Sequence, residues 1–430
     1  MTSSSSPISM IIDCDPGHDD AMALVVAARH ANLIGVTTVA GNAPISATTR
    51  NARIVLDMIG SKAPLHQGAN RPLVAPPRDA SYIHGKSGLD GADLPEPSGP
   101  ADSQDAVGFI IDTCRATEGV WLVPTGPLTN IALALRSAPD IARRIAGISL
   151  MGGGSFGNRS AAAEFNIWAD PEAAAMVFEY GGKLIMSGLD VTHKLQATPQ
   201  RIDKVRALSG HLASVLADLF VFFSDVYVKR HDNMQGGAVH DPCAVLALTH
   251  PQLFTTKPQH VVIELNGEHT RGMTMIDQRG LIERLNPNCE VVWDVQAEEA
   301  FDVIVEAIGH YSKELLAPAH QFFNIAEIKR IRAGQNNVLC TDLFVLSKDF
   351  RCHFFWIDGN RSLDLARVTT DLCAPFIQNL DLVAIALWRT KVVVLIGMLC
   401  NEAQRKFLAT ATNHDWDSAI DWLRVEFCQT

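Results

Sequence analysis

The feature that most constrains this chain is a short acidic segment near its start, Asp-Cys-Asp-Pro-Gly-His-Asp-Asp at residues 13–20. An apolar run precedes it at 8–12, and a helical pattern follows it at 21–29. Pro16 fixes φ and Gly17 permits a sharp turn, so the segment predicts a strand, a tight turn and the start of a helix. In open α/β sheets, ligands bind at the carboxyl ends of the strands, which is where this turn would lie.

Four aspartates fall within this segment: Asp13, Asp15, Asp19 and Asp20. Crowded carboxylates raise one another's pKa unless a cation lies among them. A hard cation such as Ca²⁺ or Mg²⁺ prefers such an all-oxygen cluster. The alternative is that Asp19 and Asp20 complement the helix start and that the other two are solvated turn residues. Capping does not need four acids around Pro-Gly, so we favour a metal site.

Apolar runs alternate with helical patterns through the first 310 residues. This alternation predicts an α/β fold, a Rossmann-like open, mostly parallel sheet with helices on both faces. The predicted strands lie at residues 8–13, 33–39, 120–123, 145–151, 183–188 and 260–265. The predicted helices lie at 19–31, 46–59, 105–117, 128–137, 171–180, 202–223, 241–249 and 298–308. The Pro- and Gly-rich segment 68–100 has no periodic pattern, and a loop of that length is usually functional, often a lid.

Composition divides the chain into three parts. Residues 1–7 are a Ser-rich leader that we expect to be disordered, and 8–310 carry the strand and helix pattern. Residues 311–430 are a C-terminal extension that holds 3 of the 30 glycines and 2 of the 21 prolines, so the turn signals of the body disappear there. The extension contains no chemical motif, and its function is unknown.

Composition also excludes some classes of partner. The formal net charge of −11 argues against nucleic acid, because proteins that bind nucleic acid carry basic patches. The longest apolar stretch, 380–400, is interrupted by Asp381, Arg389 and Lys391 and makes a poor membrane span. Nine cysteines at irregular spacing, with no secretory signal, fit reduced thiols in a cytoplasmic protein.

Two further motifs follow predicted strands. Asn42 comes just after 33–39, where it either contacts a ligand or caps the next helix. Gly126 and Pro127 shape a turn that can leave the Thr125 carbonyl free, and such carbonyls are typical ligands of hard cations. The alternative for the second motif is an ordinary loop between a strand and a helix.

A glycine-rich motif follows the strand predicted at 145–151. Three glycines come after Met151, and then Asn158, Glu164 and Asn166. Glycines allow close backbone approach, and amide and carboxylate groups supply the donors and acceptors that vicinal hydroxyls need. The motif lacks the phosphate-loop pattern, so we favour a pocket for a polyol over a merely flexible loop.

Two histidines are candidates for chemistry. His240 and Asp241 precede the helix predicted at 241–249. Asp241 either caps that helix or completes the oxygen cluster around the cation. His240 would then lie beside the metal as an acid–base group, although a lone histidine is more often structural. His84 lies in the long loop and reaches a ligand only if that loop closes.

Together and in this order, the motifs resemble those of the inosine–uridine-preferring nucleoside hydrolases. The matching segments are residues 13–20, Ala-Gly-Asn at 40–42, Thr-Gly-Pro-Leu-Thr-Asn at 125–130, Met-Gly-Gly at 151–153, Glu-Phe-Asn at 164–166, Asp-Pro at 170–171 and His-Asp-Pro at 240–242. The resemblance covers about residues 8–310. It implies the nucleoside hydrolase fold, hydrolysis of the N-glycosidic bond of ribonucleosides with one bound Ca²⁺, and a homodimer or homotetramer.

The resemblance also implies roles for the matched residues. Asp15, Asp20, the Thr125 carbonyl and Asp241 correspond to the Ca²⁺ ligands. Asp19, Asn42, Asn158, Glu164 and Asn166 correspond to ribose contacts, with Met151 beside them, and His84 is a further candidate contact. Asp13 would orient the ligands, Asp15 would act as the general base toward water, and His240 would assist departure of the base.

The sequence departs from the family in two places. His18 occupies a variable position of the acidic signature, and we expect it to face the helix surface. The extension lies outside the resemblance, so we expect truncation after His310 to leave a soluble, active enzyme.

Two other functions fit part of the pattern. One is a non-catalytic, Ca²⁺-dependent nucleoside- or sugar-binding protein, which the intact acidic cluster argues against. The other is a phosphatase that forms an aspartyl phosphate, but there Thr usually follows the second Asp closely, whereas Pro16 and Gly17 follow here.

Overall fold

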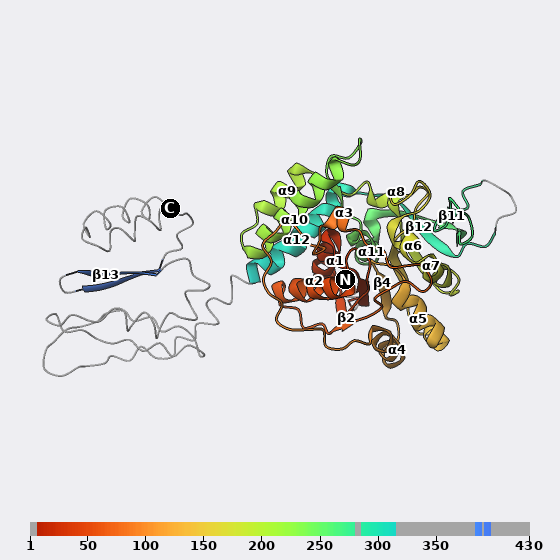
Figure 1. Ribbon diagram of the computed structural model, residues 1–430, viewed down its shortest axis with the longest axis horizontal. Helices are drawn as coiled ribbons and strands as arrows, with labels where there is room; N and C mark the ends of the chain where they lie inside the picture. The colour runs from red at the N-terminus through yellow and green to blue at the C-terminus, as the bar shows by residue number, and fades with distance from the viewer. Residues whose placement is uncertain (1–6, 280–284, 315–382, 389–390, 397–430) are drawn as a thin grey trace, which may run out of the picture. The chain divides into compact units, whose positions relative to one another are not determined.

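The computed structural model describes residues 7–279, 285–314, 383–388 and 391–396 (Figure 1). Most of the predicted leader and most of the extension therefore lie outside the described residues. Contacts between residues divide the chain into two units, Met1–Ala319 and His320–Thr430. In the second unit, the described residues form an antiparallel pair of strands, β13 (Val383–Trp388) and β14 (Lys391–Ile396). The role of the extension stays a prediction.

The first unit is built on an eight-stranded sheet with the order β3-β2-β1-β4-β5-β6-β12-β9. Its strands are β1 (Ser9–Cys14), β2 (Asn32–Thr38), β3 (Leu65–Gln67), β4 (Trp121–Pro124), β5 (Gly147–Met151), β6 (Leu184–Ser187), β9 (Phe254–Gln259) and β12 (Cys289–Val295). All neighbouring strands are parallel except β12 and β9. The predicted mostly parallel sheet is confirmed.

Helices cover both faces of this sheet (Figure 1). The longer helices are α1 (His18–His30), α2 (Ile45–Met58), α4 (Ala106–Ala116), α5 (Thr129–Ser137), α7 (Pro171–Phe178), α9 (Pro199–Arg206), α10 (His211–Val228), α11 (Pro242–Thr249) and α12 (Ala297–Glu314). Alternate residues of β1 enter two separate core clusters, as the two-residue period of a strand requires. Met10 and Ile12 pack with α1, α2, α10, α11 and α12, whereas Ile11 packs with α4, α5 and α7.

Shorter elements lie around this framework. They are α6 (Phe165–Ala169), α8 (Leu189–Thr192), the 3-10 helices η1 (Pro139–Arg143) and η2 (Pro251–Leu253), and two antiparallel pairs. One pair joins β7 (Gln196–Ala197) to β8 (Gly237–Ala238), and the other joins β10 (Val261–Ile263) to β11 (Thr274–Ile276).

Two predictions of secondary structure were wrong in detail. The helix predicted at 202–223 is two helices, α9 and α10, which are separated at Gly210, where φ is +112°. The strand predicted at 260–265 is β10, which pairs with β11 outside the main sheet. The main sheet continues beyond β6 with β12 and β9. These two strands were not predicted, because Glu290 and Asp294 interrupt one apolar run and the other strand is largely exposed.

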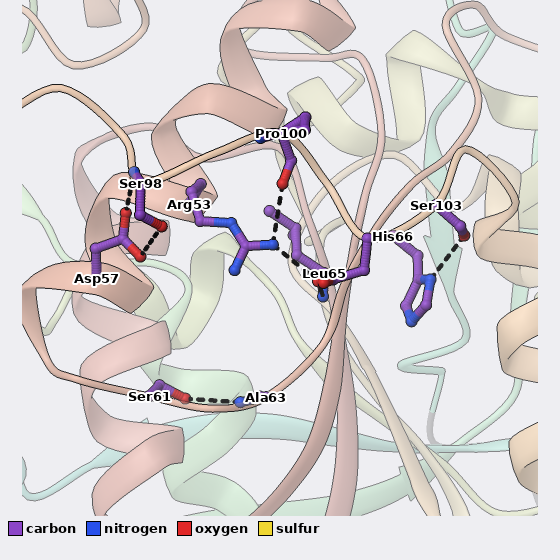
Figure 2. A network of polar contacts seen from close by, with 10 residues as sticks. Arg53, Asp57, Ser61, Ala63, Leu65, His66, Ser98, Pro100 and Ser103 are labelled. Atoms are coloured by element: carbon purple, nitrogen blue, oxygen red, sulfur yellow. Dashed lines mark hydrogen bonds and ion pairs between the residues drawn. The ribbon is translucent and has the colours of Figure 1, made fainter.

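The long loop 68–100 is not structureless, since it contains the short helix α3 (Ser81–His84). Its end is held against α2 and β3 by a network of polar contacts (Figure 2). Arg53 Nη2 donates to the carbonyl oxygen of Pro100 and to Asp102 Oδ2, at 3.1 and 2.8 Å. The backbone N–H and the hydroxyl of Ser98 donate to Asp57, at 2.7 and 2.8 Å. The C-terminal end of the loop, at residues 98–102, is therefore anchored to α2.

Among the described residues, α10 is the one helix that is long and apolar enough to cross a membrane by length and composition. Of its apolar window, 56% is buried within the protein, and its residues Leu216 and Phe220 belong to the core that covers one face of the sheet. A core helix passes the same test, and packing explains the composition of α10.

Candidate active site

The turn between β1 and α1 brings acidic side chains to the carboxyl end of the central strand. The chain turns at Pro16 and Gly17, and α1 begins at His18. Asp20 Oδ2 accepts from the N–H of Gly17 at 2.9 Å, so Asp20 does cap the helix, as the alternative explanation proposed. Its other oxygen, Oδ1, accepts from the Thr125 hydroxyl at 2.8 Å. One aspartate therefore both starts α1 and contacts the loop after β4.

Asp19, Asp20 and Asp241 form a buried cluster in which one oxygen of each carboxylate lies within 4.8 Å of the others. Asp241 comes from the start of α11, where its side chain makes no capping hydrogen bond. Burial, followed by the charge of neighbouring carboxylates, raises the pKa of Asp19 to about 7 and that of Asp241 well above its usual range. Three buried like charges are unfavourable unless protons or a cation compensate them.

Asp15 lies beside this cluster, and burial followed by the charge of Asp20 raises its pKa well above the usual range. Its Oδ2 accepts from the backbone N–H of Asn42 at 2.6 Å. Its Oδ1 is buried, and no described residue donates to it. Gly41 and Gly126 leave room for this carboxylate, because a Cβ on either would lie 2.1 or 2.4 Å from its oxygens.

These observations fit a bound metal ion. Asp15, Asp19, Asp20 and Asp241 supply only oxygen atoms, which are the ligands that hard cations prefer. The unpaired Oδ1 of Asp15 is a buried acceptor that needs a positive partner. The acidic cluster is thus able to hold a metal ion, and the grouping of Asp19 with Asp20 and Asp241 was not expected, because Asp19 was predicted as a ribose contact.

Asp13 and the Thr125 loop support the cluster from within the sheet. Asp13 Oδ1 accepts from the hydroxyl of Thr37 and from the amide of Asn130, at 2.7 and 2.8 Å. Burial raises the pKa of Asp13 to about 7. The N–H of Thr125 donates to the backbone carbonyl of Asp13. The carbonyl of Thr125 accepts from Asn166 Nδ2 at 2.7 Å. One lone pair of that carbonyl is therefore already used.

A second group of polar side chains, which forms one wall of the site, lies around the glycines that follow β5. Glu164 caps α6 by accepting from the N–H groups of Asn166 and Ile167, and it also accepts from the N–H of Gly153 at 2.9 Å. These three donors compensate the charge of a fully buried carboxylate. Asn158 Oδ1 accepts from the N–H of Phe165 at 3.0 Å. The wall presents amide and carboxylate groups on a fixed backbone.

Asn42 contacts the acidic cluster rather than capping a helix. Its Nδ2 donates to Asp20 Oδ2 at 3.2 Å, while α2 begins at Ile45 without a side-chain cap. The capping alternative for Asn42 is therefore wrong.

His240 is buried, and both of its ring nitrogens have partners. Nε2 lies 2.6 Å from the hydroxyl of Tyr227, and Nδ1 lies 2.7 Å from the hydroxyl of Thr192. Burial and the nearby His193 lower the pKa of His240 well below its usual range, so the neutral imidazole is favoured. A neutral imidazole between two hydroxyls is able to pass a hydrogen bond from one to the other.

His84 is brought into the site by α3, as its position in the long loop allowed. Its Nδ1 lies 3.0 Å from Nδ1 of His18, whose Nε2 lies 2.8 Å from the carbonyl oxygen of Asp90. His18 is fully buried and stacks on Phe222 and Phe223. The expectation that His18 faces the helix surface was wrong, because the loop 68–100 packs over the start of α1.

One pocket of about 220 Å³ collects most of the predicted residues. Those that line it are Asp19, Asn42, His84, Thr125, Met151, Asn158, Glu164, Asn166, His240 and Asp241. Asp15 and Asp20 do not line it, but they contact Asn42 and Thr125, which do.

Sequence reasoning missed several residues that line the pocket, namely Tyr82, Phe223, Tyr227, Arg230 and His231. Phe223 and Tyr227 are four residues apart on one face of α10, a spacing that places two side chains together. This spacing does not by itself show which face of the helix lines the pocket, so the two side chains could not be placed from the sequence.

Comparison with known proteins agrees with this geometry. The pattern of the family described as "Inosine-uridine preferring nucleoside hydrolase" matches residues 10–302. The chain belongs to this nucleoside hydrolase family. Members are ribonucleoside hydrolases, so the chain is an enzyme of this class with a small-molecule ribonucleoside as substrate.

Individual relatives match 71% of the length of this nucleoside hydrolase. The pyrimidine-specific ribonucleoside hydrolase of Enterobacter sp. (strain 638) is 39% identical over 310 residues, which are 71% of this chain and 99% of the relative. The enzyme of the same name from Shewanella woodyi is 41% identical, with the same two coverages. The solved purine-preferring ribonucleoside hydrolase from Gardnerella vaginalis has a TM-score of 0.67 at 32% identity, and the match covers 71% of this chain and 99% of that one.

Proposed function

We propose that this enzyme hydrolyses the N-glycosidic bond of ribonucleosides to free base and ribose, with Ca²⁺ as its metal and Asp15 as its general base. The observation that carries the proposal is the buried, unpartnered Oδ1 of Asp15 beside the carboxylates of Asp20 and Asp241. Such an atom is suited both to a cation and to a proton from water.

Asp15, Asp20, Asp241 and the Thr125 carbonyl would hold the ion, the carbonyl through its second lone pair. When bound, Ca²⁺ eases the deprotonation of water and binds hydroxyl groups of the sugar. The geometry also leaves Asp19 close enough to Asp20 and Asp241 to contact either the ion or the ribose. Asp13 would help to orient these metal ligands, because its backbone carbonyl accepts a hydrogen bond from the N–H of Thr125.

Asp15 would take the proton of the attacking water. A carboxylate whose pKa is raised by burial is a stronger base than an exposed one. Oδ2 is fixed by the N–H of Asn42, so Oδ1 is the atom left to accept the proton. The water oxygen then bonds to the anomeric carbon as the bond to the base breaks.

The surrounding carboxylates would stabilise the sugar during this step. Cleavage of a glycosidic bond passes through a state with positive charge on the ribose, and fixed negative groups lower its energy. Asp19 and Glu164, which line the pocket, would supply that charge, and Asn42, Asn158 and Asn166 would hold the hydroxyls. Met151 lies beside them as an apolar contact.

His240 would assist the leaving base through Tyr227. In the arrangement that we propose, the Thr192 hydroxyl donates to Nδ1, and Nε2–H donates to the oxygen of Tyr227. The hydroxyl proton of Tyr227 is then free to bind the departing base. His84 closes the pocket from the long loop, where it lies beside the rings of Phe223 and His18.

The test is Asp15→Asn, which keeps the shape of the side chain and removes its basicity. We expect kcat on uridine and inosine to fall by about a thousandfold, within the range of a general base, while the Asn42 N–H keeps an acceptor. A reducing-sugar assay measures ribose release. Near-normal turnover by this variant would show that Asp15 is not the base.

For base preference, the names of the relatives support pyrimidine ribonucleosides, since both relatives at 39 and 41% identity are named pyrimidine-specific. The structure at 32% identity is named purine-preferring, so purines are the competing substrates. A panel of uridine, cytidine, inosine, adenosine and guanosine, compared by kcat/KM, tests the preference. Higher kcat/KM for the purines would contradict it.

The remaining proposals concern location and assembly. Cys14, Cys114, Cys243 and Cys289 are buried free thiols, which supports a reducing, cytoplasmic setting and a role in nucleoside salvage. Val262 and Met275 are cross-strand neighbours on β10 and β11 and are 43 and 45% exposed, which supports a homodimer or homotetramer. Light scattering on the purified chain tests the assembly, and a monomeric mass would contradict it.

A further inference from the structure

Cationic and aromatic side chains alternate in a row that we call the rim, and two of them, Tyr82 and Arg230, line the pocket. They are Arg78 and Tyr82 of the long loop, Arg159 of the loop after β5, Trp168 of α6 and Arg230, which follows α10. The guanidinium carbons of Arg78 and Arg159 lie 3.8 and 4.1 Å from the centre of the Trp168 ring. Those of Arg159 and Arg230 lie 5.7 and 5.0 Å from the centre of the Tyr82 ring.

The order of this ladder follows from sterics. Two guanidinium groups so close to the centre of one ring would overlap on a single face, so Arg78 and Arg159 lie on opposite faces of Trp168. Arg159 also contacts Tyr82, which in turn contacts Arg230. The ladder is therefore Arg78, Trp168, Arg159, Tyr82 and Arg230, and it joins segments that are far apart in the sequence.

Stacking occupies the face of a guanidinium but leaves its N–H groups available in the plane. Among the described residues, no carboxylate pairs with Arg78, Arg159 or Arg230, and all three are exposed. Arg230 uses one N–H on the carbonyl of Tyr82 at 3.1 Å. By contrast, the nearby Arg271 is paired with Glu172. In a chain of net charge −11, three unpaired cations at one rim are unusual and favour an anion.

The rim adjoins one end of the proposed ribose site. Asn158 and Glu164 line the pocket, and Arg159 directly follows Asn158 in the chain. Phe223 and Tyr227, whose rings suit a base, also line the pocket. In the pose of the proposed function, the diol binds the carboxylates and the base binds these rings. The 5′ carbon is then left for the wall of Asn158 and Glu164, next to Arg159.

We propose that this rim binds the phosphate of a nucleoside 5′-monophosphate, whose ribose occupies the pocket. The inference rests on the proposed function, because the position of the ribose is taken from it. Arg159 and Arg230, which both contact Tyr82, bind the phosphate through their free N–H groups, and Arg78 adds its charge from the far face of Trp168. Planar guanidinium groups bind phosphate in pairs of parallel hydrogen bonds.

The test uses probes that the enzyme cannot hydrolyse: ribose 5-phosphate, ribose and inorganic phosphate, each titrated calorimetrically into the metal-replete full chain. We expect ribose 5-phosphate to bind at least about tenfold more tightly than ribose, the size of one charge-assisted hydrogen bond. Higher salt should reduce this advantage, because the rim is exposed. Arg159→Gln and Arg230→Gln should each remove most of it, and Arg159→Lys should retain part.

Arg136→Gln is the matched control, since it removes one exposed charge from α5, away from the pocket-lining residues. Its binding of ribose 5-phosphate should equal that of the wild type. Thermal melting of each variant shows whether the fold is kept. Arg159 and Arg230 lie on separate segments, so the same loss of binding in both variants indicates loss of the site and not of the fold.

Three results would overturn the proposal. The first is that ribose 5-phosphate binds no better than ribose, the second is that its advantage survives in the double Gln variant, and the third is that inorganic phosphate alone binds as tightly. Nucleoside hydrolysis by the wild type is measured in parallel. Hydrolysis without a phosphate advantage refutes this inference alone, whereas a phosphate advantage without hydrolysis of any nucleoside supports the rim site and refutes the proposed function.

Discussion

The hydroxyl of Tyr227 lies 2.6 Å from Nε2 of His240, and both side chains are buried at the pocket. Tyr227 comes from α10 and His240 from the segment before α11, so the pair links two helices on one face of the sheet. Because burial keeps His240 neutral, the pair is suited to directing a hydrogen bond rather than to holding a charge.

Removing the hydroxyl tests this relationship. We predict that Tyr227→Phe lowers kcat on uridine and inosine by at least about tenfold, because the leaving base loses a hydrogen bond in the transition state. Tyr180→Phe is the control, since its hydroxyl donates to the carbonyl of Lys183 and does not line the pocket. Equal kcat for the Tyr227 and Tyr180 variants would contradict a role for Tyr227.

The two glycines around Asp15 give a second prediction. A methyl group at Gly126 would lie 2.4 Å from Asp15 Oδ1, so Gly126→Ala must displace the carboxylate. We expect a loss of kcat of about a hundredfold or more, as for a misplaced catalytic group, together with weaker metal binding. Gly99→Ala meets nothing within 4 Å and should keep full activity. An active Gly126→Ala enzyme would show that the position of Asp15 is not critical.

The fold and the site were predictable from the sequence to different degrees. Repeated apolar strands with helices between them gave the parallel sheet, and polar residues directly after strands marked its carboxyl edge. The break at Gly210 was missed because apolar residues continue on both sides of it. His18 and Tyr227 were missed because their roles depend on contacts with α3 and on the segment before α11, which are distant in the sequence and leave no local pattern.

The end of the first unit gives a third prediction. The helix α12 continues to Glu314, and Ser312 is buried against Gly210, where α9 gives way to α10. Truncation after Ala319 should therefore leave a folded, active enzyme. Truncation after His310, which the sequence favoured, should lower the free energy of unfolding by about 1–3 kcal/mol, because it removes buried contacts. Equal urea midpoints for the two truncations would contradict this revision.

A fourth prediction concerns pH. Burial lowers the pKa of His193 from 6.5 to about 4, so the unfolded chain takes up this proton first as the pH falls. Its stabilising contribution is present above pH 6.5 and is lost as the pH falls toward about 4. His193→Gln should reduce the drop in unfolding free energy between pH 7 and pH 5 by about 1–2 kcal/mol. Parallel pH profiles for the variant and the wild type would contradict this assignment.

The most direct test of the account is nucleoside hydrolysis by the full chain before chelation, after exhaustive chelation and after return of Ca²⁺. The account predicts that ribose release from uridine and inosine is lost on chelation and restored by Ca²⁺, since the carboxylates at the end of β1 then regain their cation. Ribose release that continues unchanged in protein shown by elemental analysis to be free of metal would contradict it.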